Sequence, residues 1–244
     1  MNRRTFILVP GAWMDEWIWA GIEQRLRARG QVVHAMTLPG LESPPLLHYQ
    51  ISLENHVQYV ADFLTVSNLR EVILVGHNYS GLVVGQVAQR LPEQVCHTVF
   101  LEAYVPEDGC SLLELAGLDV EAVQRQIDGN QGLWPAPSQD VLAYETRLTE
   151  ADRAALEQRF VDHPGRTVTD PARLQGSLAG LSATYVGRQA PTVIRDWLAQ
   201  PESERNWQHI LLEGGHWPML SIPNQLTAAL LAADCRSAAR ALQT

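Results

Sequence analysis

Short apolar runs alternate with segments of helical periodicity along most of the chain. The apolar runs predict buried strands at Thr5–Val9, Gln31–Met36, Glu71–Gly76, His97–Leu101, Ser182–Val186 and Gln208–Leu212. The periodic segments predict helices at Trp17–Arg29, Leu53–Thr65, Leu82–Leu91 and from Pro223 onward, where proline suits a first helical turn. Alternating strands and helices are typical of a mostly parallel sheet covered by helices on both faces.

The strand pattern stops between Gly109 and about Gly180. Polar helical stretches replace it, for example Val120–Asp128 and Glu150–Phe160, with the sequence WPAP at 134–137 between them. We therefore expect an α/β core built from residues 1–108 and 181–244, with residues 109–180 inserted as a helical cap.

The composition narrows the range of partners. A chain of 244 residues with 46% hydrophobic content can bury one large core. Its net charge of −9 argues against a nucleic-acid partner, because phosphate binding needs clustered basic residues. No apolar run approaches the roughly 20 residues that cross a bilayer. We expect a small-molecule substrate, no nucleic acid and no membrane, and we leave a homodimer open.

The three cysteines, Cys96, Cys110 and Cys235, form neither a CxxC pair nor an even set. The apolar run near the start ends at Pro10 without a small-residue cleavage site, so it resembles a first strand more than a signal peptide. These features predict free thiols, a reducing compartment and a cytoplasmic location.

The sequence GHNYSG at 76–81 lies between a predicted strand and a predicted helix. A G-x-S-x-G turn in this context lifts a nucleophile above the sheet edge and places backbone N–H groups beside it, where they stabilise an oxyanion. We expect those N–H groups from Tyr79 and, in the loop after the first strand, from Ala12. The central residue is Asn78, whose amide nitrogen is a poor nucleophile because its lone pair is delocalised. A plain strand-to-helix turn is the structural alternative.

His216 stands in the glycine-rich sequence GGHWP that follows the last predicted strand, where this architecture places its general base. Further motifs accompany it: VPGAW at 9–13, LPG at 38–40 and LEAYVP at 101–106. Together these segments resemble the α/β-hydrolase branch that contains plant methyl esterases, hydroxynitrile lyases and bacterial relatives. The resemblance covers nearly the whole chain. It implies an α/β-hydrolase fold, a buried pocket beneath the cap, small carbonyl substrates, and no cofactor or metal.

The chain departs from that family at two positions. Relatives carry serine where this chain has Asn78, and they usually carry an orienting aspartate after the strand at 182–186, where this chain reads GRQAP. Glu102 is a substitute for that acid, since some members of the superfamily take it from this earlier strand. The alternative, that Glu102 does not contact His216, has equal weight.

Four further residues are candidates for substrate binding. Trp13, Trp134 and Trp217 could line a pocket for an aromatic or polycyclic substrate, although tryptophans are as often part of a core. Ser80 is the hydroxyl nearest to Asn78, but it occupies the second glycine position of the turn. It is therefore a weaker candidate for the nucleophile than for a binding residue.

The missing serine shapes the expected function. Removing the serine of a hydrolytic triad costs on the order of 10⁶ in rate, whereas a positioned histidine contributes roughly 10²–10⁴ and an oxyanion donor roughly 10²–10³. We expect a cofactor-independent acid-base enzyme in which His216 moves a proton and Asn78 orients the substrate, catalysing decarboxylation, C–C cleavage, or cyclisation of a polyketide-like intermediate. The alternatives are hydrolysis of an ester, lactone or epoxide by water that His216 activates, and a non-catalytic ligand-binding protein. Asn78 also fits a replacement of the aspartate that epoxide hydrolases and dehalogenases carry at the elbow.

Overall fold

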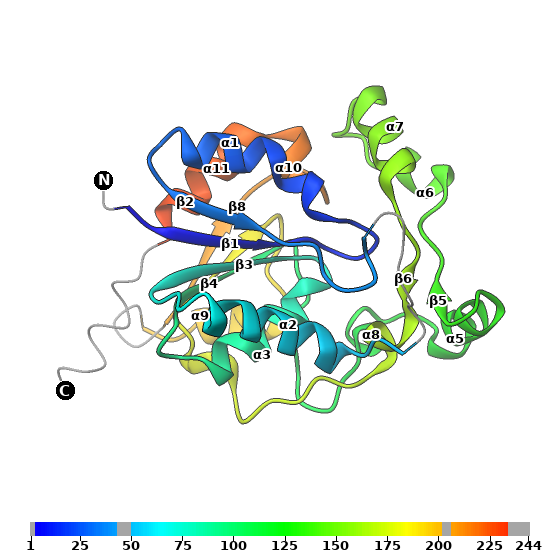
Figure 1. Ribbon diagram of the computed structural model, residues 1–244, viewed down its shortest axis with the longest axis horizontal. Coiled ribbons are helices and arrows are strands. Elements are labelled where there is room, and N and C mark those ends of the chain that lie inside the picture. Colours follow the sequence, from blue (N-terminus) through cyan, green and yellow to red (C-terminus); the bar gives the residue numbers. More distant parts are fainter. Residues whose placement is uncertain (1–2, 43–49, 202–205, 234–244) are drawn as a thin grey trace.

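The computed structural model describes residues 3–42, 50–201 and 206–233. Its centre is a six-stranded sheet in the order β2-β1-β3-β4-β7-β8, in which every neighbouring pair is parallel (Figure 1). The strands are β1 (Thr5–Val9), β2 (Val32–Ala35), β3 (Val72–His77), β4 (Val95–Leu101), β7 (Ala183–Gly187) and β8 (Trp207–Leu211). The predicted parallel sheet and α/β-hydrolase fold are confirmed.

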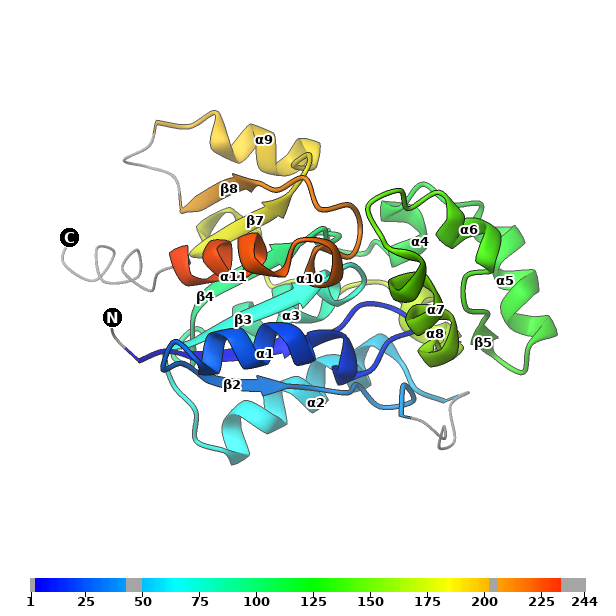
Figure 2. The same cartoon turned by 90° about the horizontal axis from the view of Figure 1, so that it is seen from above.

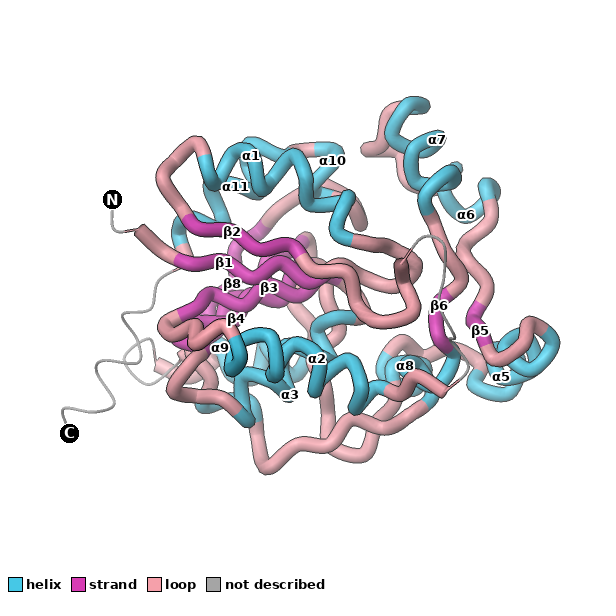
Figure 3. Tube along the Cα trace, in the orientation of Figure 1, coloured by secondary structure: helices cyan, strands magenta, loops and turns pink. Residues whose placement is uncertain are grey.

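Helices cover both faces of this sheet (Figure 3). One layer contains α1 (Ala20–Arg27), α10 (Pro218–Ser221) and α11 (Pro223–Ala232); the other contains α2 (Leu53–Val66), α3 (Ser80–Arg90) and α9 (Thr192–Leu198). The helix predicted at Trp17–Arg29 is divided into a short 3-10 helix, η1 (Glu16–Trp19), and α1. The Asp15 side chain accepts the Trp17 N–H and so begins this turn before the α-helix.

The apolar strand runs reflect burial on both faces. In β1, Ile7 and Val9 pack with α2 and α3, while Phe6 and Leu8 pack with α1 and α11. Successive side chains of a strand point to opposite faces, so a strand covered by helices on both sides is apolar at most of its positions.

The segment between β4 and β7 leaves the sheet at the carboxyl ends of the strands, where residues 112–169 lie (Figure 2), and then returns to the amino ends, where the Leu178 carbonyl accepts the Trp207 Nε1–H at 2.9 Å. Its elements are α4 (Leu112–Leu115), α5 (Val120–Gly129), β5 (Leu133–Trp134), α6 (Gln139–Ala143), α7 (Glu150–Arg159), β6 (His163–Pro164), α8 (Gly165–Thr169) and η2 (Leu178–Gly180). We call residues 112–169, from α4 to α8, the cap. It contains a two-residue antiparallel pair, β5 with β6, that the sequence pattern did not indicate.

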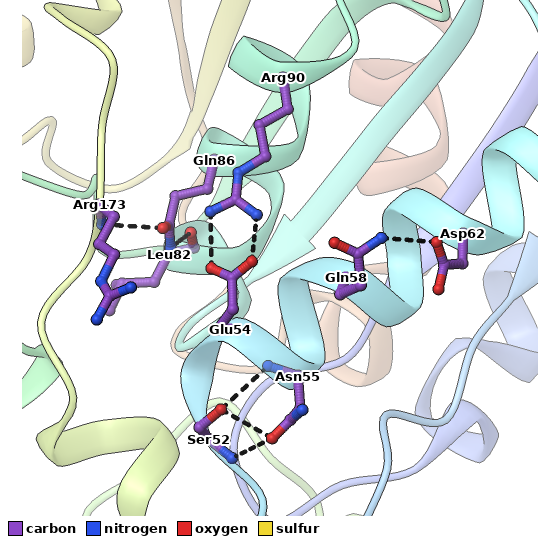
Figure 4. A network of polar contacts seen from close by, with 9 residues as sticks. All are labelled: Ser52, Glu54, Asn55, Gln58, Asp62, Leu82, Gln86, Arg90 and Arg173. Atoms are coloured by element: carbon purple, nitrogen blue, oxygen red, sulfur yellow. Dashed lines mark hydrogen bonds and ion pairs between the residues drawn. The ribbon is translucent and has the colours of Figure 1, made fainter.

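Polar contacts tie α3 to its neighbours (Figure 4). Both oxygens of the Glu54 carboxylate in α2 accept from the Arg90 guanidinium in α3, at 2.5 and 2.8 Å. The Gln86 side chain accepts the Arg173 N–H at 2.9 Å, which joins α3 to the chain returning from the cap. The helix that follows the GHNYSG turn is therefore fixed on two sides.

The cysteines differ from the sequence expectation. Cys96 is disulfide-bonded, so the prediction of free thiols is wrong for this residue. Cys110 is a free thiol, and Cys235 lies outside the described residues. An odd number of cysteines still permits one pair, which the sequence argument did not take into account. A disulfide also removes the basis for expecting a reducing compartment. None of the described helices is long and apolar enough to cross a membrane.

Candidate active site

Asn78 occupies a sharp turn between β3 and α3. Its φ of +50° lies in the left-handed region, and the residue is only 9% exposed. The Asn78 N–H donates to the Leu101 carbonyl at the end of β4, and the Asn78 carbonyl accepts from the Gly81 and Tyr104 N–H groups, all at 3.2 Å. A non-glycine residue keeps such a backbone conformation where its surroundings enforce it, and such residues cluster at active sites.

Two glycines make the turn sterically feasible. A Cβ at Gly76 would lie 2.6 Å from a Val84 methyl group, and one at Gly81 would lie 2.0 Å from the Tyr104 carbonyl oxygen. Strand, turn and helix therefore have the geometry of a nucleophile elbow, with an amide side chain at its tip.

The Ala12 N–H faces this tip. It donates to Asn78 Oδ1 over a long 3.5 Å contact, with Ala12 itself 1% exposed. Tyr79 lies at the start of α3, where backbone N–H groups have no acceptor within the helix. The Asn78 amide oxygen thus accepts the Ala12 N–H, one of the two groups predicted as oxyanion donors.

Ser80 is fully buried, and its hydroxyl donates to the Pro10 carbonyl. This bond joins the first turn of α3 to the loop that carries Ala12. In this arrangement the hydroxyl proton of Ser80 is directed at the backbone and not at Asn78, which fits a structural role.

His216 lies on the loop after β8. His77 Nε2 is 2.8 Å from the His216 carbonyl oxygen, so this nitrogen of His77 carries a proton and donates it. The His216 ring packs edge-on against Trp217, with centroids 4.8 Å apart, and none of the described residues forms a hydrogen bond or ion pair with its ring nitrogens. Burial lowers the pKa of His216 below 6.5, against the opposing charge of Glu145. The imidazole is therefore neutral at neutral pH, as a general base must be.

Glu102 follows β4 with a φ of +44°. Its Oε1 accepts the Arg188 N–H at 2.7 Å, and burial raises the pKa of its carboxyl group. Within the described chain, no hydrogen bond or ion pair joins Glu102 to His216. The arrangement therefore places Glu102 near the candidate base without the bond that an orienting acid makes.

A pocket of about 410 Å³ opens beside His216. Cap residues 144–147 line one side, and the loops after β4, β7 and β8 line the other through Glu102, Arg188, Glu213, Gly215 and His216. The lining is mostly polar, so it differs from the aromatic pocket envisaged from the tryptophans.

The three tryptophans lie in two places. Trp13 contacts Trp134 across the boundary between core and cap, with ring centroids 4.3 Å apart and its Nε1–H donating to the Trp134 carbonyl at 3.3 Å. Trp217 is 5% exposed and donates to the Met14 sulfur. Trp13 and Trp134 therefore join the cap to the loop that carries Ala12, whereas the Trp217 ring packs against the ring of His216.

The sequence analysis missed a buried polar cluster made by His56, Tyr79 and His163. The Tyr79 hydroxyl is 2.9 Å from His56 Nδ1, and His56 Nε2 is 2.8 Å from the Pro39 carbonyl oxygen. The carbonyl requires the proton on Nε2, so the tyrosine hydroxyl donates to Nδ1. Burial lowers the pKa of His56 to about 4. The only signal in the sequence is a histidine on the apolar face of the helix at Leu53–Thr65.

His163, from β6 of the cap, completes this cluster. Its Nδ1 accepts the Trp13 N–H at 3.3 Å, so the proton of the neutral ring lies on Nε2, which is buried and has no hydrogen-bond partner among the described residues. Burial, reinforced by His56, holds the pKa of His163 well below 6.5. The cap thus fixes the loop that carries Ala12 through a neutral histidine.

No group of three or more His, Cys, Asp or Glu side chains in the described parts of the chain is placed to hold a metal ion. What the site offers is a neutral histidine, backbone N–H donors and a primary amide. These groups can move protons and stabilise a developing oxyanion, but they supply no strong nucleophile.

Comparison with known proteins agrees with this geometry. A carbendazim hydrolyzing esterase from Nocardioides sp. (strain SG-4G) is 29% identical over 242 residues, covering 93% of this chain and 98% of the esterase. Among solved structures, an extracellular α/β-hydrolase from a Paenibacillus species is similar with a TM-score of 0.79 and 18% identity, over 94% of this chain and 98% of that one. A variant of tomato Methylketone Synthase I, solved in complex with β-ketoheptanoate, gives a TM-score of 0.74 and 20% identity, over 95% of this chain and 98% of that one.

The family described as "Alpha/beta hydrolase family" matches residues 6–230, which is most of the chain. Together with the parallel sheet, the elbow and the histidine loop, this match shows that the chain belongs to the α/β-hydrolase family and is an enzyme of that fold.

Proposed function

We propose that the protein hydrolyses a small ester-type substrate by direct attack of a water molecule that His216 activates. The observation that carries this proposal is the pairing of a non-nucleophilic elbow with a neutral histidine whose ring nitrogens have no partner among the described residues. The esterase relative that spans almost the whole chain supports hydrolysis over other carbonyl chemistry.

In the first step of this reaction, His216 takes a proton from water as the water oxygen attacks the carbonyl carbon. The Tyr79 and Ala12 amides stabilise the resulting oxyanion once the Asn78 side chain has released the Ala12 N–H. The Asn78 amide group then donates to the substrate. When the tetrahedral intermediate collapses, the C–O bond to the leaving alkoxide breaks and the His216 imidazolium returns the proton to that alkoxide.

This mechanism has a kinetic signature because it forms no acyl-enzyme. We expect linear product release after rapid mixing with p-nitrophenyl esters, and no acyl adduct in the intact mass of the wild-type protein. His216→Ala should lower kcat by roughly 10²–10⁴. Asn78→Ser is the matched variant, because it restores the usual nucleophile and should produce a burst phase and an adduct.

The rate should also depend on pH in a defined direction. Burial lowers the pKa of His216, so the acid limb of the wild-type rate profile should lie below pH 6.5. A wild-type acyl adduct, or a His216→Ala variant with unchanged turnover, would contradict the mechanism.

A second candidate is decarboxylation, C–C cleavage or cyclisation of a β-keto or polyketide-like substrate. None of these reactions needs the missing nucleophile, and the similar tomato structure was solved with β-ketoheptanoate bound. In the decarboxylation, His216 would first take the carboxyl proton of the β-keto acid. The C–C bond to CO₂ then breaks, and the His216 imidazolium returns the proton to the enolate carbon while the same amides stabilise the enolate. Incubation of the wild type with β-keto acids and with esters separates the candidates, because decarboxylation converts the acid to a ketone lighter by CO₂ whereas hydrolysis divides the ester into its acid and its alcohol.

A further inference from the structure

The carboxylate that usually supports a catalytic histidine is missing from its expected place. Residues 188–191, directly after β7, carry no acidic side chain, and among the described contacts Glu102 accepts from the Arg188 N–H and not from His216. A general base that becomes cationic during the reaction gains from a nearby negative charge, because that charge stabilises the imidazolium.

Another carboxylate reaches the histidine loop from the cap. Glu145 Oε2 accepts the His216 main-chain N–H at 3.3 Å. The same oxygen would lie 2.8 Å from a Cβ at Gly215, which shows how closely the side chain follows the loop. Gly215 has a φ of +73°, so glycine serves both the turn and this close approach.

We propose that Glu145 is the positioning residue for His216: it holds the histidine loop through the His216 N–H and supplies the negative charge that the strand after the cap lacks. Opposite this contact, His77 donates to the His216 carbonyl. The main chain of His216 is thus held at its N–H by the cap and at its C=O by β3. The inference rests on the proposed role of His216 as the base.

Other charged groups also lie near His216. The pocket beside it contains Glu102, Glu213, Arg147 and Arg188 in addition to Glu145, and His77 contacts it from β3. Burial lowers the pKa of His77 to about 3, so this neighbour is neutral. Among the charged lining residues, Glu145 is the one whose charge raises the pKa of His216.

The position of Glu145 gives this pairing a consequence for catalysis. It lies between α6 and α7, outside the sheet core, so the charge partner of His216 depends on how the cap is seated. A substrate that binds between cap and core would therefore contact a His216 supported by Glu145 only when the cap is seated on the core.

The test compares Glu145→Gln with Glu213→Gln. Both variants remove one negative charge from the same pocket, but only Glu145 contacts the His216 N–H. NMR titration of ¹⁵N-histidine-labelled protein, with His216→Ala to assign the resonance, measures the pKa of His216 directly. We expect Glu145→Gln to lower this pKa more than Glu213→Gln does. We also expect it to lower kcat by between about tenfold and 10⁴-fold, the upper figure being the loss seen for a triad aspartate, with KM little changed.

Equal shifts of the His216 pKa in the two variants would overturn the proposal. A rise in the KM of Glu145→Gln with kcat unchanged would overturn it as well. The titration needs no turnover, so it stays informative even if the protein proves not to hydrolyse esters. Glu145→Ala is a second variant in case Glu145→Gln misfolds, and its His216 pKa must also lie below that of the wild type.

Discussion

Gly81→Ala tests whether the elbow is held by close backbone packing. A Cβ at this position would lie 2.0 Å from the Tyr104 carbonyl oxygen and 3.0 Å from the Ala103 Cβ. A comfortable carbon-to-oxygen contact is about 3.3 Å, so the helix and the loop after β4 must separate by about 1.3 Å. The blocking atom belongs to the backbone and cannot rotate away.

Two effects of opposite sign contribute to the stability change. Alanine in place of glycine within a helix is worth about 1 kcal/mol, whereas overpacking a dense site costs about 1–3 kcal/mol and occasionally more. Because the overlap here is with backbone, we take the upper end of the overpacking range. Less the gain from alanine, we expect the free energy of unfolding to fall by about 2 kcal/mol. With an m value of about 2 kcal/mol per M, the urea midpoint should fall by about 1 M.

Gly129→Ala is the matched control. Gly129 is the last residue of α5 and is exposed, and apart from its neighbours in the helix none of the described atoms lies within 4 Å of an added Cβ. Its urea midpoint, followed by tryptophan fluorescence, should be unchanged or slightly raised. If Gly81→Ala unfolded at the same urea concentration as Gly129→Ala, the packing argument for the elbow would be refuted.

Two further predictions concern stability and pH. Burial lowers the pKa of His56 from 6.5 to about 4, so the unfolded chain binds a proton that the folded protein does not. The free energy of unfolding should therefore decrease as the pH falls from 6.5 to about 4, by up to about 3 kcal/mol from this residue. Urea titrations at both ends of that pH window measure the decrease. Equal free energies of unfolding at the two pH values would exclude the buried neutral histidine. Hydrogen bonding to Arg90 lowers the pKa of Glu54, so this pair contributes stability above the unfolded pKa of 4.5 and loses it as the pH falls through the folded value. Because the pair is partly exposed, Glu54→Gln should lower the free energy of unfolding by less than about 1 kcal/mol at pH 7. This difference from wild type should become smaller in acid. A difference independent of pH would mean that the ion pair does not contribute to stability.

The strands and the elbow could be predicted from the sequence because their signals are local. The run predicted at Thr5–Val9 is apolar from Phe6 onward, and its bounds are those of β1. The sequence GHNYSG places its glycines where the turn needs them, and Asn78 takes the left-handed backbone conformation there. Periodicity reports which side of an element is buried, and a glycine pattern reports where backbone must pass close to backbone.

The partners of the site residues could not be predicted in this way. Glu145 reaches His216 across 71 positions, and His163 reaches Trp13 across 150. In both contacts the cap supplies a side-chain acceptor to a main-chain N–H in a core loop, and nothing in the local pattern of either segment indicates the other.

The sequence alone therefore determined the fold, the elbow and the identity of the residue at its tip, because these depend on patterns within single elements. Only the tertiary structure decided three contacts: Asn78 Oδ1 accepts the Ala12 N–H, Glu102 accepts the Arg188 N–H, and the Glu145 carboxylate of the cap accepts the His216 N–H. These contacts form where loops from the carboxyl ends of the strands converge with the cap. Their distances depend on how separate elements pack, which the periodicity of one segment does not specify.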